Sequence, residues 1–174
     1  EQLLIVFTNM EKNPSFKMDK NSVLISFDAF IQCIIVKAVL HKRSFEVGEL
    51  NYIKNTSFRN DAMYLIDALP DYFFEVAAAS TGKYHPKYAQ GEGGLVRHTK
   101  SAVRIAYELL EDPAIGNKYT SDEKDLMLIS LMLHDGLKLG KEKNKYTRFD
   151  HPLLVGEFIK ENKANLNFSD DEIN

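Results

Sequence analysis

A histidine followed directly by an aspartate closes the most apolar stretch of this chain. The pair is His134-Asp135, and residues 126–133 before it are apolar except for Ser130. An imidazole and a carboxylate buried without partners would be costly, whereas one divalent cation would provide a partner for both. The partial negative charge at the end of a helix also favours a cation. The pattern therefore indicates a metal site. The competing interpretation is a polar pair that caps the helix in an exposed loop.

Three further residues on neighbouring segments have suitable chemistry. His98 falls on an apolar stripe, where it is either a second ligand or a core histidine bonded to a backbone carbonyl. His151 precedes Pro152 at a helix start and is either a ligand or a cap. Lys138 follows Asp135 by three residues, so its ammonium would reach an anion held by the metal, unless it is a solvated lysine.

The loop at residues 82–88 offers cations, aromatic rings and a histidine. Such a loop suits a phosphate and a base or sugar, and it equally suits an ordinary surface loop. Its candidates are Lys83 and His85. Arg97 is a further candidate, although it points about 100° away from His98 on a helix. The loop at 138–148 is lysine-rich, and its Lys141, Lys143 and Lys145 are interpreted as solvated side chains.

Composition excludes several classes of protein. The 174 residues suffice for one domain with a full core, perhaps with an extension. Cys33 is the only cysteine, which excludes an intrachain disulfide and a cysteine-rich zinc site. The net charge of −3 argues against long nucleic acid as the main partner. No apolar run approaches a membrane span, and no signal peptide is visible. We therefore expect a soluble cytoplasmic domain that is part of a larger protein.

Hydrophobic periodicity predicts a mainly α fold. Residues 1–58 are ambiguous, with strand-like runs at 3–7 and 23–27 and a helix over 28–42, so this extension is α or mixed α+β. Further helices are expected over 60–69, 71–79, 94–111, 121–133 and from 152 onward, and loops over 80–93 and 112–120. Two details follow. The helix at 94–111 should bury Leu95, His98, Ala102, Ile105 and Leu109, and the helix at 121–133 is apolar nearly all round, so it should be central and buried.

These motifs together resemble a known family. His98, His134-Asp135 and Lys138 spell H…HDxxK, and residues 93–99 read GGLVRHT. With PDYFF at 70–74, His85, and the HPL that starts at His151, the chain resembles the HD-domain metal-dependent phosphohydrolase superfamily, most closely the HD domain of bacterial 3′–5′ exoribonucleases. The resemblance covers about residues 59–168. It implies an HD-like helical bundle at 59–174, truncated at its C-terminal end, after an N-terminal extension at 1–58.

The resemblance also implies roles for individual residues. The metal ligands would be His98, His134 and Asp135, with His151 as a second-metal or substrate ligand. Lys138 and Asp135 would be catalytic, and substrate would contact His85, Lys83 and Arg97. The cofactor would be a divalent ion (Mn, Ni, Co, Fe, Zn or Mg), and the partner a phosphate-containing small molecule or a short nucleic acid. The family closes its ligand set with an aspartate from a later helix, for which only Asp170 and Asp171 are candidates, and both look like helix-capping acids.

Three functional hypotheses follow. The first is an active metal-dependent phosphohydrolase acting on a nucleotide or a nucleic-acid end. The second is a non-catalytic HD-like module with an incomplete metal site that binds a nucleotide or a protein. The third is a helical domain whose histidines serve only as core and cap residues.

Overall fold

The structure, a computed structural model, describes residues 48–79 and 85–173. The predictions for residues 1–47, for Lys83 and for the loop at 80–84 lie outside these ranges. The described residues are mainly helical and contain no strand, which confirms the mainly α class. The elements are η1 (Glu49–Tyr52), α3 (Thr56–Ala68), α4 (Tyr72–Glu75), η2 (Lys87–Ala89), α5 (Gly94–Glu111), α6 (Pro113–Gly116), α7 (Ser121–Leu133), α8 (His151–Glu161), η3 (Lys163–Asn165) and α9 (Asp170–Ile173). None of these helices is long and apolar enough to cross a membrane.

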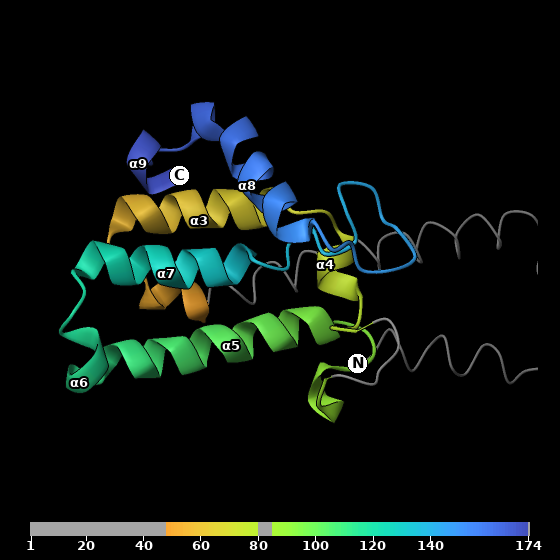
Figure 1. Cartoon of the computed structure of the whole chain (residues 1–174), viewed down its shortest axis with the longest axis horizontal. Helices are drawn as coiled ribbons and strands as arrows, with labels where there is room; N and C mark the ends of the chain where they lie inside the picture. Colours follow the sequence, from red (N-terminus) through yellow and green to blue (C-terminus); the bar gives the residue numbers. More distant parts are fainter. Residues whose placement is uncertain (1–47, 80–84, 174) are drawn as a thin grey trace, which may run out of the picture. The chain divides into compact units, whose positions relative to one another are not determined.

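Helix α7 occupies the middle of the bundle. It packs against α5 on one side and against α3 on the other, and it runs antiparallel to α5 (Figure 1). The C-terminal end of α7 therefore lies beside the N-terminal half of α5. The short elements α4 and η2 pack on α5 as well. Their shared core is built from fully buried side chains such as Phe73, Leu95, Leu128 and Leu133.

The bounds of α5 are those predicted, because residues with restricted or unusual backbone conformations lie at both ends. Gly93 precedes the helix with a φ of 68°, a left-handed conformation that favours glycine. At the other end Asp112 is extended, as expected for a residue before proline. Its side chain accepts a hydrogen bond from the amide of Ala114 (2.8 Å) and so caps a further helix, α6. The prediction of an unbroken loop over 112–120 was therefore wrong.

The buried face of α5 also differs from the prediction. Leu95, Thr99 and Val103 are fully buried, whereas Ile105 and Leu109 are 59% and 49% exposed. His98 is only half-buried. The buried face therefore includes the neighbouring stripe of Val96, Thr99 and Val103. His98 consequently lies at the border between the core and solvent.

Helix α3 begins four residues before its predicted start at Asn60. Its cap is Asn55, whose side chain accepts from the amides of Ser57 and Phe58. Asp61, which was expected to cap this helix, is buried and accepts from the backbone amides of Asn167 and Phe168 (2.7 and 3.1 Å). The boundary expected between residues 58 and 59 falls within α3.

The second predicted helix, 71–79, is reduced to α4 at Tyr72–Glu75. Its last carbonyl groups instead accept hydrogen bonds from the glycine-rich segment that follows. The carbonyl of Glu75 accepts from the amide of Gly93 (2.7 Å), and the carbonyl of Val76 accepts from the amide of Leu95 (2.9 Å). These bonds replace the helical ones and tie the start of α5 to α4.

Helix α7 is less enclosed than its sequence predicted. Met127 is 39% exposed and lies in a groove of about 760 Å³ between α5, α6 and α7. The groove is apolar, with Leu109, Ile115 and Leu131 among its lining residues, and it includes His134. The expectation of a fully buried helix was thus wrong for this face.

The start of α7 is fixed by a capping box that the sequence analysis overlooked. The Thr120 hydroxyl accepts from the amide of Glu123, and the Glu123 carboxylate accepts from the amide of Thr120 (3.2 and 2.7 Å). We expect Thr120→Ala to lower the free energy of unfolding by about 1 kcal/mol, measured by urea denaturation. Ser121→Ala, one residue inside the helix, is the control and should be close to neutral. Equal losses from both substitutions would contradict the assigned cap.

Candidate metal centre

The end of α7 presents His134 and Asp135 in fixed orientations. Buried Met132 and Leu133 anchor the last turn in the core. The Nδ1 atom of His134 lies 2.6 Å from the carbonyl oxygen of Leu131. A carbonyl only accepts, so Nδ1 carries the proton and Nε2 keeps its lone pair. A hydrogen bond of this kind sets the tautomer of a metal-binding histidine.

The tight turn after this pair depends on Gly136. Its amide donates to the carbonyl of Leu133 (2.7 Å). A Cβ atom at this position would lie 2.6 Å from Leu69 Cδ2. Glycine therefore lets the turn pack closely against the end of α3, and this packing holds Asp135 at 4% exposure.

His98 reaches the same place from α5. The hydrogen bonds from Gly93 and Leu95 to the α4 region fix the first turn of α5, one turn before His98. The side chains of His98, His134 and Asp135 each offer a ligand atom, and these atoms all lie within 4.8 Å of one another. The three candidates expected to share one cation are thus brought together, although they come from two helices and from positions 36 residues apart.

Burial and nearby charges shift the pKa values of His98 and Asp135. Burial, together with the nearby His85, lowers the pKa of His98 below its ordinary value, so its ring is neutral near pH 7. Burial alone would raise the pKa of Asp135. The hydrogen bond from Lys138, together with the nearby His134, the charge of Lys138 and the nearby His151, outweighs this effect and holds that pKa below its usual range. The cluster therefore presents a neutral imidazole beside an ionised carboxylate.

Lys138 and His151 join the cluster through Asp135. The Nζ atom of Lys138 lies 2.8 Å from Asp135 Oδ2, and the Nε2 atom of His151 lies 3.1 Å from Oδ1. His151 is oriented by its Nδ1 atom, which lies 2.5 Å from the carbonyl oxygen of Arg148. His85 packs on His98, with its ring centroid 4.6 Å from that of His98. Three histidines thus lie around the Asp135 carboxylate, and His85 packs on one of them, His98.

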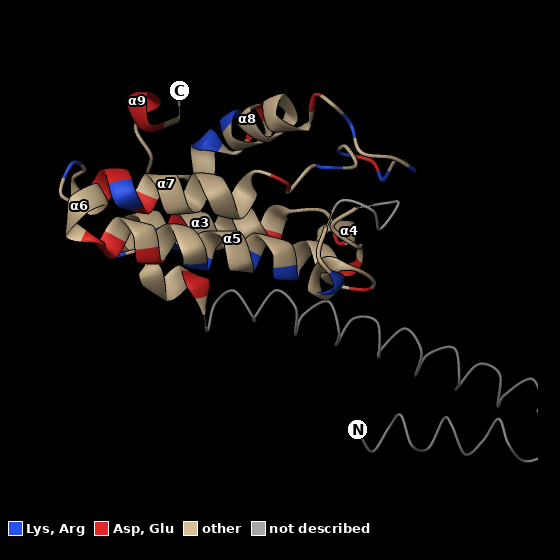
Figure 2. Ribbon diagram, turned by 60° about the horizontal axis from the view of Figure 1, so that its bottom comes forward, with Lys and Arg blue, Asp and Glu red and all other residues tan. Residues whose placement is uncertain are grey.

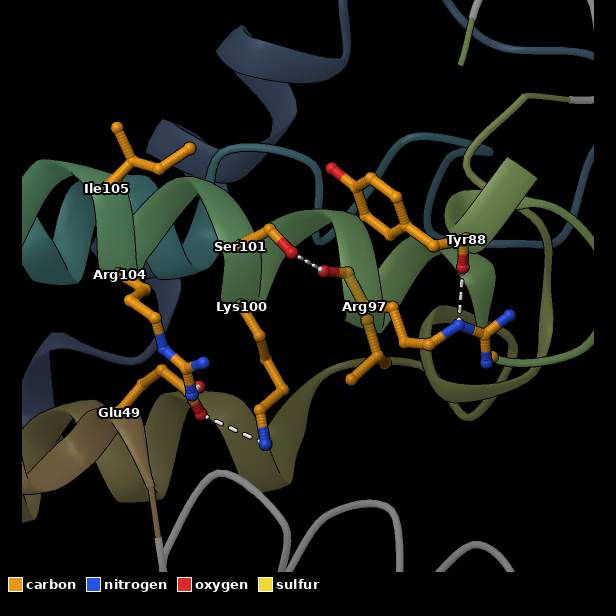
Figure 3. Close-up of a pocket in the computed structure, with 9 residues that line it drawn as sticks. Glu49, Tyr88, Arg97, Lys100, Ser101, Arg104 and Ile105 are labelled. Atoms are coloured by element: carbon orange, nitrogen blue, oxygen red, sulfur yellow. Dashed lines mark hydrogen bonds and ion pairs between the residues drawn. The ribbon is translucent and has the colours of Figure 1, made fainter. Parts of the chain in front are cut away.

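Arg97 lies away from this cluster. Its guanidinium donates to the carbonyls of Tyr88, Gln90 and Glu92 (2.6, 2.8 and 2.8 Å), so it holds the loop before α5 together. Figure 3 shows it on the pocket-lining face of α5. The role in substrate binding expected for Arg97 thus has no support in its contacts.

The pocket beside Arg97 is dominated by a buried carboxylate. Glu49 is 1% exposed, and its Oε2 atom lies 3.0 Å from the Nζ of Lys100. Arg104 approaches the other oxygen at 3.7 Å (Figure 3). Lys100 and Arg104, two of the three α5 cations that line this pocket, are therefore directed to Glu49 and hold η1 on the helix.

The late aspartates do not join the cluster within the described residues. Asp170 forms an ion pair with Lys163. It stands with Asp171 in the first turn of α9, which packs against α8. In Figure 1, α9 lies near the start of α3. The cluster instead lies at the C-terminal end of α7.

Tyr72 is a supporting residue that sequence reasoning did not single out. Its hydroxyl donates to the carbonyl of Gly140 (2.7 Å) and accepts from the amide of Leu139 (3.2 Å). These bonds fix the loop that carries Lys138. The signal available in the sequence was a tyrosine inside an aromatic core segment, since a buried hydroxyl requires a partner.

We expect Tyr72→Phe to lower the free energy of unfolding by about 1–2 kcal/mol, because two buried backbone groups lose their partner. Tyr64→Phe is the matched control, since the Tyr64 side chain is 37% exposed and its hydroxyl bonds the side chains of Asn162 and Asn165 rather than buried backbone groups. Burial raises the pKa of Tyr72, partly offset by the bond from Leu139. The folded state thus favours the protonated phenol, and the stabilisation fades as pH rises above about 10. Urea denaturation at pH 8 and above pH 10 should show the difference between wild type and Tyr72→Phe shrinking. A constant difference would contradict this role.

Comparisons of the chain with protein-family models, with curated proteins and with solved structures gave no match.

Proposed function

We propose that this chain is a metal-dependent phosphohydrolase with an HD-like helical bundle. The observation that carries the proposal is the convergence of His98, His134 and Asp135 within 4.8 Å, with Lys138 bonded to the same carboxylate. The H…HDxxK spacing in the sequence points to the same residues. A core or capping role alone would not require two helices to direct these side chains to one point.

The residues fit a divalent cation. Two ligands on opposite sides of one ion are separated by about 4.2 Å, twice the usual ligand distance, so separations up to 4.8 Å need only small side-chain rotations. Two imidazoles and a carboxylate form a borderline-to-hard donor set that suits Zn, Mn, Fe, Ni or Co. The hydrogen bond from His134 Nδ1 to Leu131 leaves Nε2 as the donor atom.

The chemistry follows from these groups. A bound divalent cation polarises a phosphoryl oxygen and lowers the pKa of water. In hydrolysis, water adds to phosphorus, the bond from phosphorus to the leaving oxygen breaks, and that oxygen takes up a proton. Lys138 offsets the negative charge on the phosphoryl group. Asp135 holds Lys138 at 2.8 Å and so positions this ammonium beside the ligands.

His85 and His151 flank the cluster and are suited to contact substrate. His151 is 19% exposed at the side chain, and His85 packs on His98. The ring of His85 can donate a hydrogen bond to a phosphate oxygen, whereas His151 would do so by exchanging its contact with Asp135 for one with the phosphate. The substrate class that this supports is a phosphate ester, either a nucleotide or the end of a short nucleic acid.

The test combines metal analysis with hydrolysis. Purified protein is incubated with Mn²⁺ or Ni²⁺, desalted, and analysed for bound metal, and turnover of bis-p-nitrophenyl phosphate is then measured. His134→Ala should lose both metal and turnover, whereas Ser130→Ala, one turn earlier on α7, should keep both. Retention of metal and turnover by His134→Ala would overturn the proposal. Nucleotide binding without turnover in the wild type would instead support the non-catalytic module.

A further inference from the structure

A second cavity lies directly beside the candidate metal centre. Its volume is about 230 Å³, and Lys138 is one of its lining residues. The same lysine is bonded to Asp135, so an anion that touches Lys138 from this cavity also lies next to the cluster. The short segment 76–79, which follows α4, also lines this cavity and carries only small apolar side chains.

All charged side chains that line this cavity are positive. Three lysines, Lys138, Lys143 and Lys145, line it together with the polar side chains of Asn144 and Thr147, and none of its lining residues is acidic. Lys143 approaches Glu75 only at 3.9 Å, where both side chains are about half exposed. Within the described part of the chain, Lys145 forms no ion pair. In Figure 2 the loop between α7 and α8 is blue at several places, which marks its lysines and arginine. The pocket at Glu49 differs, because its lysine and arginine face a buried carboxylate.

The loop that presents these lysines is fixed by its own hydrogen bonds. The backbone amide and the side-chain amide of Asn144 both donate to the carbonyl of Leu139 (2.9 and 2.7 Å). The amide of Arg148 donates to the carbonyl of Lys138 (2.9 Å), which closes the loop at its base. Tyr72 holds Leu139 and Gly140 from the core side. A loop fixed in this way presents its cations with little further loss of conformational entropy on binding.

The size of the cavity limits its occupant. Pockets that enclose a whole drug-sized ligand usually measure roughly 300–1,000 Å³, so about 230 Å³ suits one group of a ligand whose remainder lies elsewhere. Lysine is a common phosphate-binding residue and acts as a point charge. We propose that this cavity binds a second phosphate of the substrate, and that the substrate is a small molecule with a diphosphate group. The inference rests on the proposed function, since it takes the first phosphate to lie at the metal centre.

The binding test needs neither metal nor turnover. The ¹⁵N-labelled full chain in EDTA is titrated with inorganic pyrophosphate and with orthophosphate and followed by NMR. Pyrophosphate should bind at least about tenfold more tightly, as one additional charged hydrogen bond supplies, and should shift amides in 76–79 and 138–147. The double substitution Lys143→Ala/Lys145→Ala should weaken pyrophosphate binding by at least about tenfold.

The control is Lys141→Ala. This lysine belongs to the same loop but pairs with Glu161 (2.6 Å) and does not line the cavity. It should change the pyrophosphate affinity by less than about twofold, the effect expected of a screened surface charge. Equal weakening by Lys141→Ala and by the double substitution would overturn the inference, because the loop would then act only as a diffuse basic surface. Equal affinities for the two anions would overturn it as well.

Turnover separates the two proposals. If the metal-loaded protein hydrolyses p-nitrophenyl phosphate and a nucleoside diphosphate, the double substitution should raise KM for the diphosphate alone. Unchanged KM values would overturn the diphosphate site and leave the phosphohydrolase standing. Selective pyrophosphate binding without any hydrolysis would do the opposite, supporting the anion site while the proposed reaction fails.

Discussion

Replacing Asp135 with asparagine is expected to weaken metal binding by at least about 100-fold, because loss of even an outer partner of a ligand costs 10–100-fold. Hydrolysis of a phosphodiester should fall by at least about 10³-fold, since an ion's stabilisation of the transition state is worth several kcal/mol. The substitution keeps the shape of the side chain and removes its charge. Metal content by mass spectrometry and turnover at saturating Mn²⁺ measure the two effects.

Asp122→Asn is the matched control for this experiment. It makes the same chemical change at the exposed first turn of the same helix, α7. Metal content and turnover should match those of the wild type. If Asp135→Asn behaved like this control, Asp135 would not be a ligand and the metal centre would be refuted.

The stability of Asp135→Asn helps to distinguish a metal centre from a purely structural role of these residues. Asp135 is the ion-pair partner of Lys138 and of His151, and its loss leaves a largely buried ammonium without its carboxylate. We expect the free energy of unfolding in EDTA to fall by about 1.5–3 kcal/mol. If the wild type bound no metal and Asp135→Asn lost only stability, the histidines would serve as core and cap residues, and the third hypothesis would be supported.

The sequence was most informative where local signals are strong. The bounds of α5 followed from Gly93-Gly94 and from Asp112-Pro113, because the conformations of these residues are restricted by their own covalent structure. The start of α7 at Ser121 was predicted correctly, but its cap was missed, although Thr120 and Glu123 have the spacing of a capping box. That signal was available and was missed. The start of α3 was misassigned for a different reason, since Asp61 is held by Asn167 and Phe168, over 100 residues away.

The candidate site, like the fold, was predictable from local signals but not from long-range contacts. The residue types and spacing of His98, His134 and Asp135 pointed to one centre, and the structure brings them together. The contacts of Arg97 and the position of Lys143 and Lys145 were not predictable. They depend on where the loops before α5 and after α7 fold back, which is set by hydrogen bonds between distant backbone groups. Short-range patterns carry no information about such bonds.

The close approach of two backbone segments at Gly94 leads to the second large effect. A Cβ atom on Gly94 would lie 2.2 Å from the carbonyl oxygen of Ala89 and 3.1 Å from the Cα of Ala77. The obstacles are backbone atoms, and the Ala89 carbonyl accepts a hydrogen bond from the amide of Ala78 (3.0 Å). Gly94→Ala therefore cannot be relieved by a side-chain rotation. We expect the free energy of unfolding to fall by about 3 kcal/mol, the upper end of the range for overpacking.

Gly156→Ala is the control, because Gly156 lies in α8 with no other atom within 4 Å of an added Cβ. Alanine there should raise stability by about 0.5–1 kcal/mol through its higher helix propensity. Urea denaturation of both variants gives the comparison. A Gly94→Ala protein as stable as Gly156→Ala would show that the two segments are not in close contact.

Gly94→Ala should also weaken metal binding, because His98 lies one turn after Gly94 and moves with the start of α5. His134 and Asp135 are held by a different helix and do not follow that movement. The metal affinity of the folded variant, measured well below its unfolding midpoint, should therefore fall, whereas that of Gly156→Ala should not change. An unchanged affinity in Gly94→Ala would mean that His98 is not positioned by the contact between Gly94 and Ala89.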